Sequence, residues 1–102
     1  MEYNNTKPGE YIISFNDKQF DKHAVNAMYD DDELQSNGSV LILDLENIDR
    51  ITSDGYNYLS SFMKYAEGNE KQVLFTNIPD EIRELISLAF NIIFIKREFI
   101  VV

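Results

Sequence analysis

The sequence predicts a single α/β domain built on a mainly parallel β-sheet. Short apolar runs alternate along the chain with segments of helical period, in the order β-α-β-α-β-α-β. Such alternation implies right-handed crossovers between parallel strands. The length of 102 residues is that of one domain. Hydrophobic residues make up 44% of the chain, with seven Phe and six Tyr, which excludes a disordered polymer.

The first third of the chain is expected to contribute one strand and one helix. Residues 1–9 are polar and are predicted to be a flexible arm ahead of a single domain at 10–102. The run Tyr11–Phe15 is rich in β-forming residues and is the first expected strand. From Phe20 onward apolar residues recur at helical spacing, and Gly38 ends that helix.

The rest of the chain alternates more regularly. The unbroken apolar run Val40–Leu43 predicts a strand that is buried on both faces, as in a parallel sheet. Pro79 is a favourable helix start, and that helix would bury a stripe of Ile82, Leu85, Ile86 and Ala89. The other expected elements are a loop at 46–52, a helix at 53–66, and strands at 73–75, 92–95 and 99–102.

The composition argues against several classes of function. The formal net charge is -9, so the surface repels nucleic acid and anionic lipid. The chain has no cysteine, which excludes disulfides and thiolate metal sites and makes the cytoplasm the expected compartment. No apolar run approaches the ~20 residues needed to span a bilayer, and the first residues show no secretory signal.

Catalytic and metal-binding patterns are also missing from the sequence. His23 is the only histidine, so most pairs of nucleophile and base are unavailable. The four glycines form no phosphate-binding loop. The run Asp30–Glu33 lacks the ligand spacing and central glycine of a calcium loop, which favours a solvated helix end. The sequence therefore predicts a protein that is not an enzyme and that uses no cofactor or metal.

The distinctive segment joins the strand at 40–43 to the helix at 53–66. It lies at the carboxyl end of the predicted sheet, where open α/β sheets bind their ligands. Thr52 and Ser53 place hydroxyls at the helix start, and Asp54 adds a favourable negative charge there. Gly55 is expected to allow a close approach, either of a partner or of the helix to the sheet.

The stretch 39–55 resembles the STAS domain, named for sulphate transporters and anti-sigma-factor antagonists. In that family an apolar strand ends in Asp-Leu, and a short loop leads to Asp-Ser-Ser/Thr-Gly at the start of a helix. The later segments 72–78, 79–86 and 92–94 follow the family's order, so the likeness covers about residues 39–95. The resemblance implies a mixed, mainly parallel sheet of about four or five strands, with helices largely on one face.

The resemblance also implies a bacterial regulator of transcription that binds a protein partner, a serine-kinase-type anti-sigma factor. Ser53 falls where these antagonists carry the phosphorylated serine, with Thr52 as the reserve acceptor. Thr52 itself replaces the family's usual aspartate, and Asp54 replaces the second hydroxyl residue. The expected docking surface comprises Asp44, Thr52, Ser53, Asp54, Gly55, Tyr56 and Asn77.

Other functions stay open at this stage. The altered motif favours an unphosphorylated adaptor or scaffold subunit in a signalling or transporter assembly. A third hypothesis is a carrier that binds a small molecule or lipid at the same carboxyl end of the sheet. The fourth is an enzyme.

The C-terminus departs from the family, which usually ends in a helix. Residues 92–102 are expected to form a strand or hairpin that covers an open sheet edge, within the chain or across a homodimer.

Overall fold

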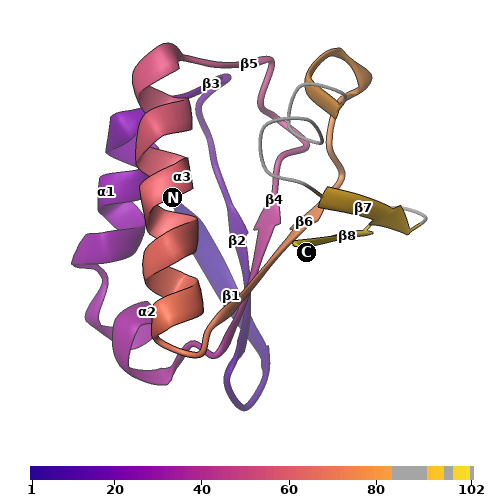
Figure 1. Cartoon of the computed structure of the whole chain (residues 1–102). Helices are drawn as coiled ribbons and strands as arrows, with labels where there is room; N and C mark the ends of the chain where they lie inside the picture. The colour runs from indigo at the N-terminus through magenta and orange to yellow at the C-terminus, as the bar shows by residue number, and fades with distance from the viewer. Residues whose placement is uncertain (84–91, 96–97, 102) are drawn as a thin grey trace.

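The computed structural model describes residues 1–83, 92–95 and 98–101 (Figure 1). Residues 80–83 begin a further helix. The other elements are β1 (Glu2–Lys7), β2 (Glu10–Ser14), β3 (Gln19–Phe20), α1 (Lys22–Asp30), α2 (Asp32–Asn37), β4 (Val40–Asp44), β5 (Arg50–Ile51), α3 (Ser53–Gly68), β6 (Gln72–Thr76), β7 (Ile92–Ile95) and β8 (Glu98–Val101).

The main sheet confirms the predicted α/β architecture. Its strand order is β1-β2-β4-β6-β8-β7, and the neighbours β2, β4 and β6 are parallel. The outer strands β1, β8 and β7 pair antiparallel, which gives a mixed sheet of six strands. Helices α1, α2 and α3 lie on one face of this sheet (Figure 1). A separate small sheet joins β3 to β5.

The hydrophobic core lies between the sheet and these helices. Alternate residues of the parallel strands point into it, because successive side chains of a strand face opposite sides. From the strands come Tyr11, Ile13, Leu41, Leu43, Val73 and Phe75. The helices add Val25, Met28, Leu34, Leu59, Phe62 and Ala66. On α3 the buried residues Leu59, Phe62 and Ala66 form one helical stripe.

Residues 1–9 were expected to be a flexible arm, but the structure has strand β1 there, paired antiparallel with β2. Tyr3 packs edge-on against Tyr11, with ring centroids 5.7 Å apart. Gly9 adopts φ +80° in the tight turn, a conformation that suits glycine. Its carbonyl accepts from the backbone N–H groups of Ser39 and Val40, at 2.8 and 2.9 Å.

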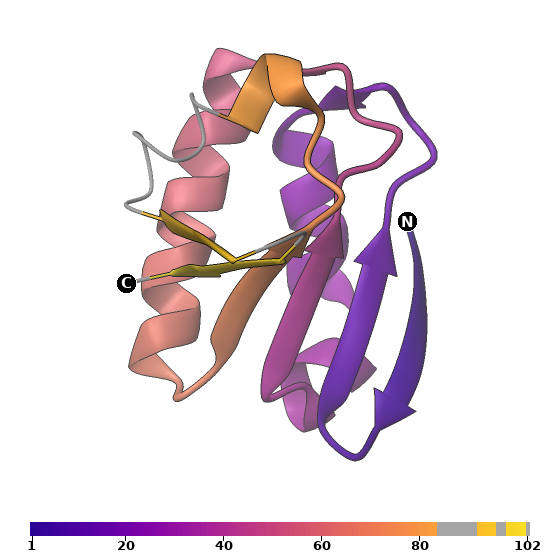
Figure 2. The ribbon, with the colours of Figure 1, turned by 90° about the vertical axis from the view of Figure 1, so that its right-hand side faces the viewer.

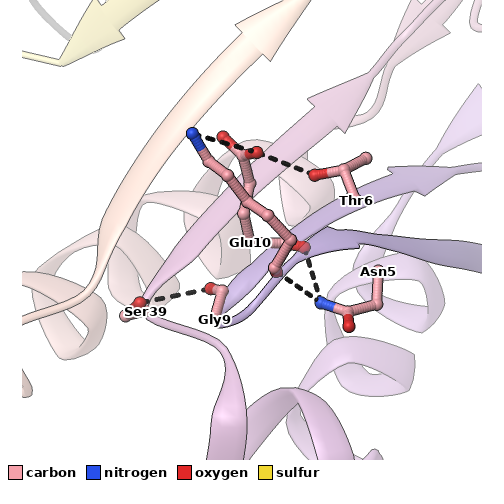
Figure 3. Close-up of polar contacts among 6 residues, drawn as sticks. Asn5, Thr6, Gly9, Glu10 and Ser39 are labelled. Atoms are coloured by element: carbon pink, nitrogen blue, oxygen red, sulfur yellow. Dashed lines mark hydrogen bonds and ion pairs between the residues drawn. The ribbon is translucent and has the colours of Figure 1, made fainter.

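Side chains near this turn reinforce it (Figure 3). The amide of Asn5 donates to the carbonyls of Lys7 and Glu10, at 2.7 and 2.9 Å. The hydroxyl of Thr6 donates to the carboxylate of Glu10, at 2.7 Å. Polar side chains thus hold β1 in place, which explains why its composition looked like that of an arm.

The first predicted helix is divided in the structure. Phe20 lies in β3, and the helical region consists of α1 and α2 with a break at Asp31. Asp21 caps α1 by accepting from the backbone N–H of His23. Asp31 caps α2 in the same way through Leu34, at 3.0 Å. Aspartate side chains compete for backbone donors, so each starts a new helix.

Strand β4 was expected to be buried on both faces. Among the described residues, only one face of β4 is buried. Leu41 and Leu43 are fully buried under the helices, whereas Val40 and Ile42 face the other way and are half-buried.

The C-terminal hairpin was predicted correctly. Strands β7 and β8 are antiparallel, and β8 pairs with β6 through the register Leu74↔Ile100. The hairpin therefore covers the β6 edge within the chain. Ile82 is buried as expected, and Leu85, Ile86 and Ala89 lie outside the described residues.

Candidate functional site

The connection from β4 to α3 is anchored at both ends. Leu45 and Ile48 are fully buried, and the backbone N–H of Leu45 donates to the carbonyl of Thr76, at 3.1 Å. Further along, the backbone N–H of Thr52 donates to the carbonyl of Phe20, at 3.0 Å. The loop is thereby fixed at the carboxyl end of the parallel strands, and α3 starts from a defined position.

Thr52 is the N-cap of α3. Its hydroxyl oxygen accepts from the backbone N–H of Gly55, at 3.1 Å. The same hydroxyl donates to the carboxylate of Asp54. This hydrogen bond lowers the pKa of Asp54, and the Gly55 N–H acts in the same direction, against burial. The charges of Lys22 and His23, at the start of α1, lower it further. The hydroxyl of Thr52 therefore both donates and accepts within the first turn of the helix that it caps.

Ser53 is the first residue of α3 and lies exposed on the surface. Within the described residues its side chain forms no hydrogen bond. The two neighbouring hydroxyls therefore differ: Thr52 is held by its own helix, and Ser53 is available to solvent. The sequence placed both hydroxyls at the helix start without separating these roles.

Gly55 is buried against the backbone that leads into α1. A Cβ atom added there would lie 2.4 Å from the carbonyl oxygen of Phe20 and 3.0 Å from the Cα atom of Asp21. Of the two close approaches considered for this glycine, the structure shows that of the helix to β3. Gly55 consequently positions the site and does not itself present a surface to a partner.

Tyr56 lies half-buried in the first turn of α3, and burial raises the pKa of its hydroxyl. The hydroxyl oxygen of Tyr56 is itself buried, so it does not face a partner.

Asp44 and Asn77 meet at the ends of neighbouring strands β4 and β6. The amide of Asn77 donates to the carboxylate of Asp44, at 3.3 Å. The same carboxylate oxygen accepts from the backbone N–H of Glu46, at 3.0 Å. Asn77 adopts φ +53°, a conformation that asparagine tolerates better than most residues. The structure thus brings these two predicted residues together.

The sequence did not reveal the small β3–β5 sheet beneath the helix start. Gln19 and Phe20 pair with Arg50 and Ile51, and the guanidinium of Arg50 donates to the side-chain oxygen of Gln19, at 2.9 Å. Strands of two residues carry no periodicity, so no pattern in the sequence could have indicated them.

The described residues hold no group of three or more potential metal ligands from His, Cys, Asp and Glu. The acidic run at 30–33 instead contains a helix break, with Asp31 as a cap. No helix within the described ranges is long and apolar enough to cross a membrane.

The strand order, the one-sided helices and the capped start of α3 define a STAS-like fold. No protein-family model and no curated protein matches the chain. A solved structure that does match is that of the anti-sigma factor antagonist SpoIIAA in its unphosphorylated form, with a TM-score of 0.66. The identity is 16%, and the match covers 85% of this chain and 81% of that one. This likeness confirms the fold that the sequence motifs implied.

Proposed function

We propose that this chain is a regulatory domain that binds a protein partner over the start of α3 and is controlled by phosphorylation of Ser53. The observation that carries the proposal is the contrast between the two hydroxyls. Ser53 is exposed on the first residue of the helix. Thr52 already serves as its cap. Ser53 is thus the acceptor that a kinase could reach without disrupting α3.

The similar solved protein is described as an anti-sigma factor antagonist in an unphosphorylated form. By analogy, the partner of this chain would be a serine-kinase-type anti-sigma factor in the bacterial cytoplasm, and the chain would regulate transcription without catalysing a reaction. Of the predicted set, Ser53 and Asn77 are exposed and would form the accessible part of the surface offered to the partner.

Phosphorylation would change binding more than folding. A phosphate adds about -1.5 to -2 charges at neutral pH, and a helix N-terminus tolerates negative charge. The neighbouring carboxylate of Asp54 is already held ionised by its hydrogen bond from Thr52. A phosphate on Ser53 would concentrate negative charge at the helix start and repel an acidic or apolar partner surface.

The test is a pull-down from the native cell, with mass spectrometry of both the partners and the phosphosites. Phosphate is expected on Ser53, and Ser53→Asp should lose the partner that Ser53→Ala retains. Thr52→Ser is the matched control, because serine preserves the cap and should leave the phosphosite at 53. Phosphate found only at Thr52 would refute the assignment.

The second candidate function is an unphosphorylated adaptor or scaffold subunit in a signalling or transporter assembly. It is favoured by Thr52 standing where the family has aspartate, since that hydroxyl is committed to Gly55 and Asp54. Equal partner binding by Ser53→Ala, Ser53→Asp and the wild type would support this function over the first. A homodimer through the C-terminal hairpin remains a prediction for either function.

A further inference from the structure

The face of the sheet opposite the helices carries its own apolar surface. Strands β2 and β4 share the burial alternation in which every second residue is only half-buried, and β6 follows it from Val73 onward. Figure 2 looks onto this face, where none of the described helices lies in front of β2 or β4. The outward aliphatic side chains are Ile12, Val40, Ile42 and Leu74, and none belongs to the core cluster.

Three of these side chains form a continuous row. The strand register pairs Ile12 with Ile42, and Ile42 with Leu74. Neighbouring strands lie about 4.8 Å apart, so the three residues stand side by side across the sheet. The backbone register continues from Leu74 to position 100 on β8. We refer to Ile12, Ile42 and Leu74 as the apolar row.

The open face is notable at the central strands β2, β4 and β6, because parallel strands are mostly covered on both faces, whereas antiparallel edge strands can face water on one side. The β4 sequence Val40–Leu43 has the continuous apolar character of a strand buried on both sides. The described chain supplies a cover for one side only. The composition of β4 therefore favours a second layer of structure over the open face of the sheet.

The charged residues around the apolar row indicate which charge a partner covering the open face would carry. Glu10 pairs in register with Val40 on one side of the row, and Asp44 pairs with Ser14 on the other. Lys7 is the cation near Glu10, at 3.7 Å, with a largely exposed side chain. A second copy of the chain would set acidic margins against each other, between two molecules of net charge -9.

We propose that the open face docks a basic amphipathic helix of a protein partner, with its apolar stripe on the apolar row and its Lys or Arg residues near Glu10 and Asp44. A helix laid on this face would complete a three-layer α/β arrangement. The proposal goes beyond the function proposed above, because it concerns the sheet face and not the start of α3.

The test uses the full chain and a synthetic helical peptide of about five turns, with Leu at the i, i+3, i+4 and i+7 positions and Lys elsewhere. Fluorescence anisotropy should show that it binds at least about tenfold more tightly than the same peptide with Glu in place of Lys. Ile42→Ser should weaken binding about tenfold, since it removes the centre of the row. Glu10→Gln should weaken it about threefold.

Tyr58→Ser is the matched control, because Tyr58 is a large apolar residue 40% exposed on α3, within the helix layer. This variant should bind the Lys peptide as the wild type does, and so should Ser53→Asp, which separates this proposal from the previous one. Equal affinity for the two peptides, or no effect of Ile42→Ser, would overturn the proposal. A dimer of the free chain that Ile42→Ser dissociates would also overturn it and assign the face to a second copy.

Discussion

Substitution of Gly55 by alanine tests whether α3 is seated on β3 as described. The added methyl group would lie 2.4 Å from the carbonyl oxygen of Phe20, and ordinary contact begins at 3.4 Å. Both neighbouring atoms belong to the backbone, so relief requires the helix start to move by roughly 1 Å, a shift that well-packed surroundings resist. That movement would break the hydrogen bond from Thr52 N–H to the same carbonyl, 3.0 Å long.

The expected magnitude follows from these terms. Overpacking costs about 1–3 kcal/mol and the lost hydrogen bond about 1 kcal/mol. Alanine returns up to about 1 kcal/mol through its higher helix propensity. Gly55→Ala should therefore lower the free energy of unfolding by about 1–3 kcal/mol.

Urea unfolding followed by circular dichroism measures this change, and Gly68→Ala provides the matched control. Gly68 ends the same helix, and a Cβ atom there would meet nothing within 4 Å. The control should be stabilised by up to about 1 kcal/mol, so the two substitutions should differ in sign. If Gly55→Ala were as stable as Gly68→Ala, the close seating of α3 on β3 would be refuted.

Three further substitutions or conditions have defined outcomes. Thr52→Ala should lose about 1 kcal/mol of unfolding free energy in urea, and Thr52→Ser should not, because serine retains the cap. Lys71 donates to the carbonyl of Gln35 at 3.0 Å and to that of Gly38, so Lys71→Met should cost about 1–2 kcal/mol in the same assay. Folding raises the pKa of four tyrosines, and hydrogen bonding to Glu33 with burial raises that of Tyr3 to about 12. Because the folded-state pKa values exceed the unfolded value near 10, the stability that these tyrosines contribute is complete below pH 10 and is lost as the pH rises through the folded-state values, which for Tyr3 is about 12. An absorbance titration should show phenolate forming together with unfolding, and independent titration without unfolding would contradict this reasoning.

Much of the fold could be predicted because its central elements carry strong local patterns. The helix expected at 53–66 is α3 (Ser53–Gly68), and the strand expected at 73–75 is β6 (Gln72–Thr76). The apolar residues of α3 recur at helical spacing, and those of β6 form a short run typical of a strand. Strand β1 escaped prediction because it is an edge strand, and apart from Tyr3 it is stabilised by backbone pairing and polar side chains.

The division of the first helix has a different cause. Its apolar residues do recur at helical spacing, so the periodicity was correctly interpreted as helical. The break is decided by Asp31, whose carboxylate takes the N–H of Leu34 and also accepts from the hydroxyl of Tyr3, at 3.1 Å. Tyr3 lies 28 positions away in β1, so no local pattern could have indicated this second contact of Asp31.

The assignment of the two hydroxyls at the site depends on a similar long-range contact. From the sequence, Thr52 and Ser53 are equally good caps, and either one could have been left as the exposed acceptor. The choice is made by the carbonyl of Phe20, because it binds the N–H of Thr52 and so fixes the residue at which the helix begins. Gly55 permits this approach, since any side chain there would push α3 away from β3. The motif at 52–55 therefore acts as a unit with β3: the glycine allows docking, the docking selects Thr52 as the cap, and the cap leaves Ser53 accessible.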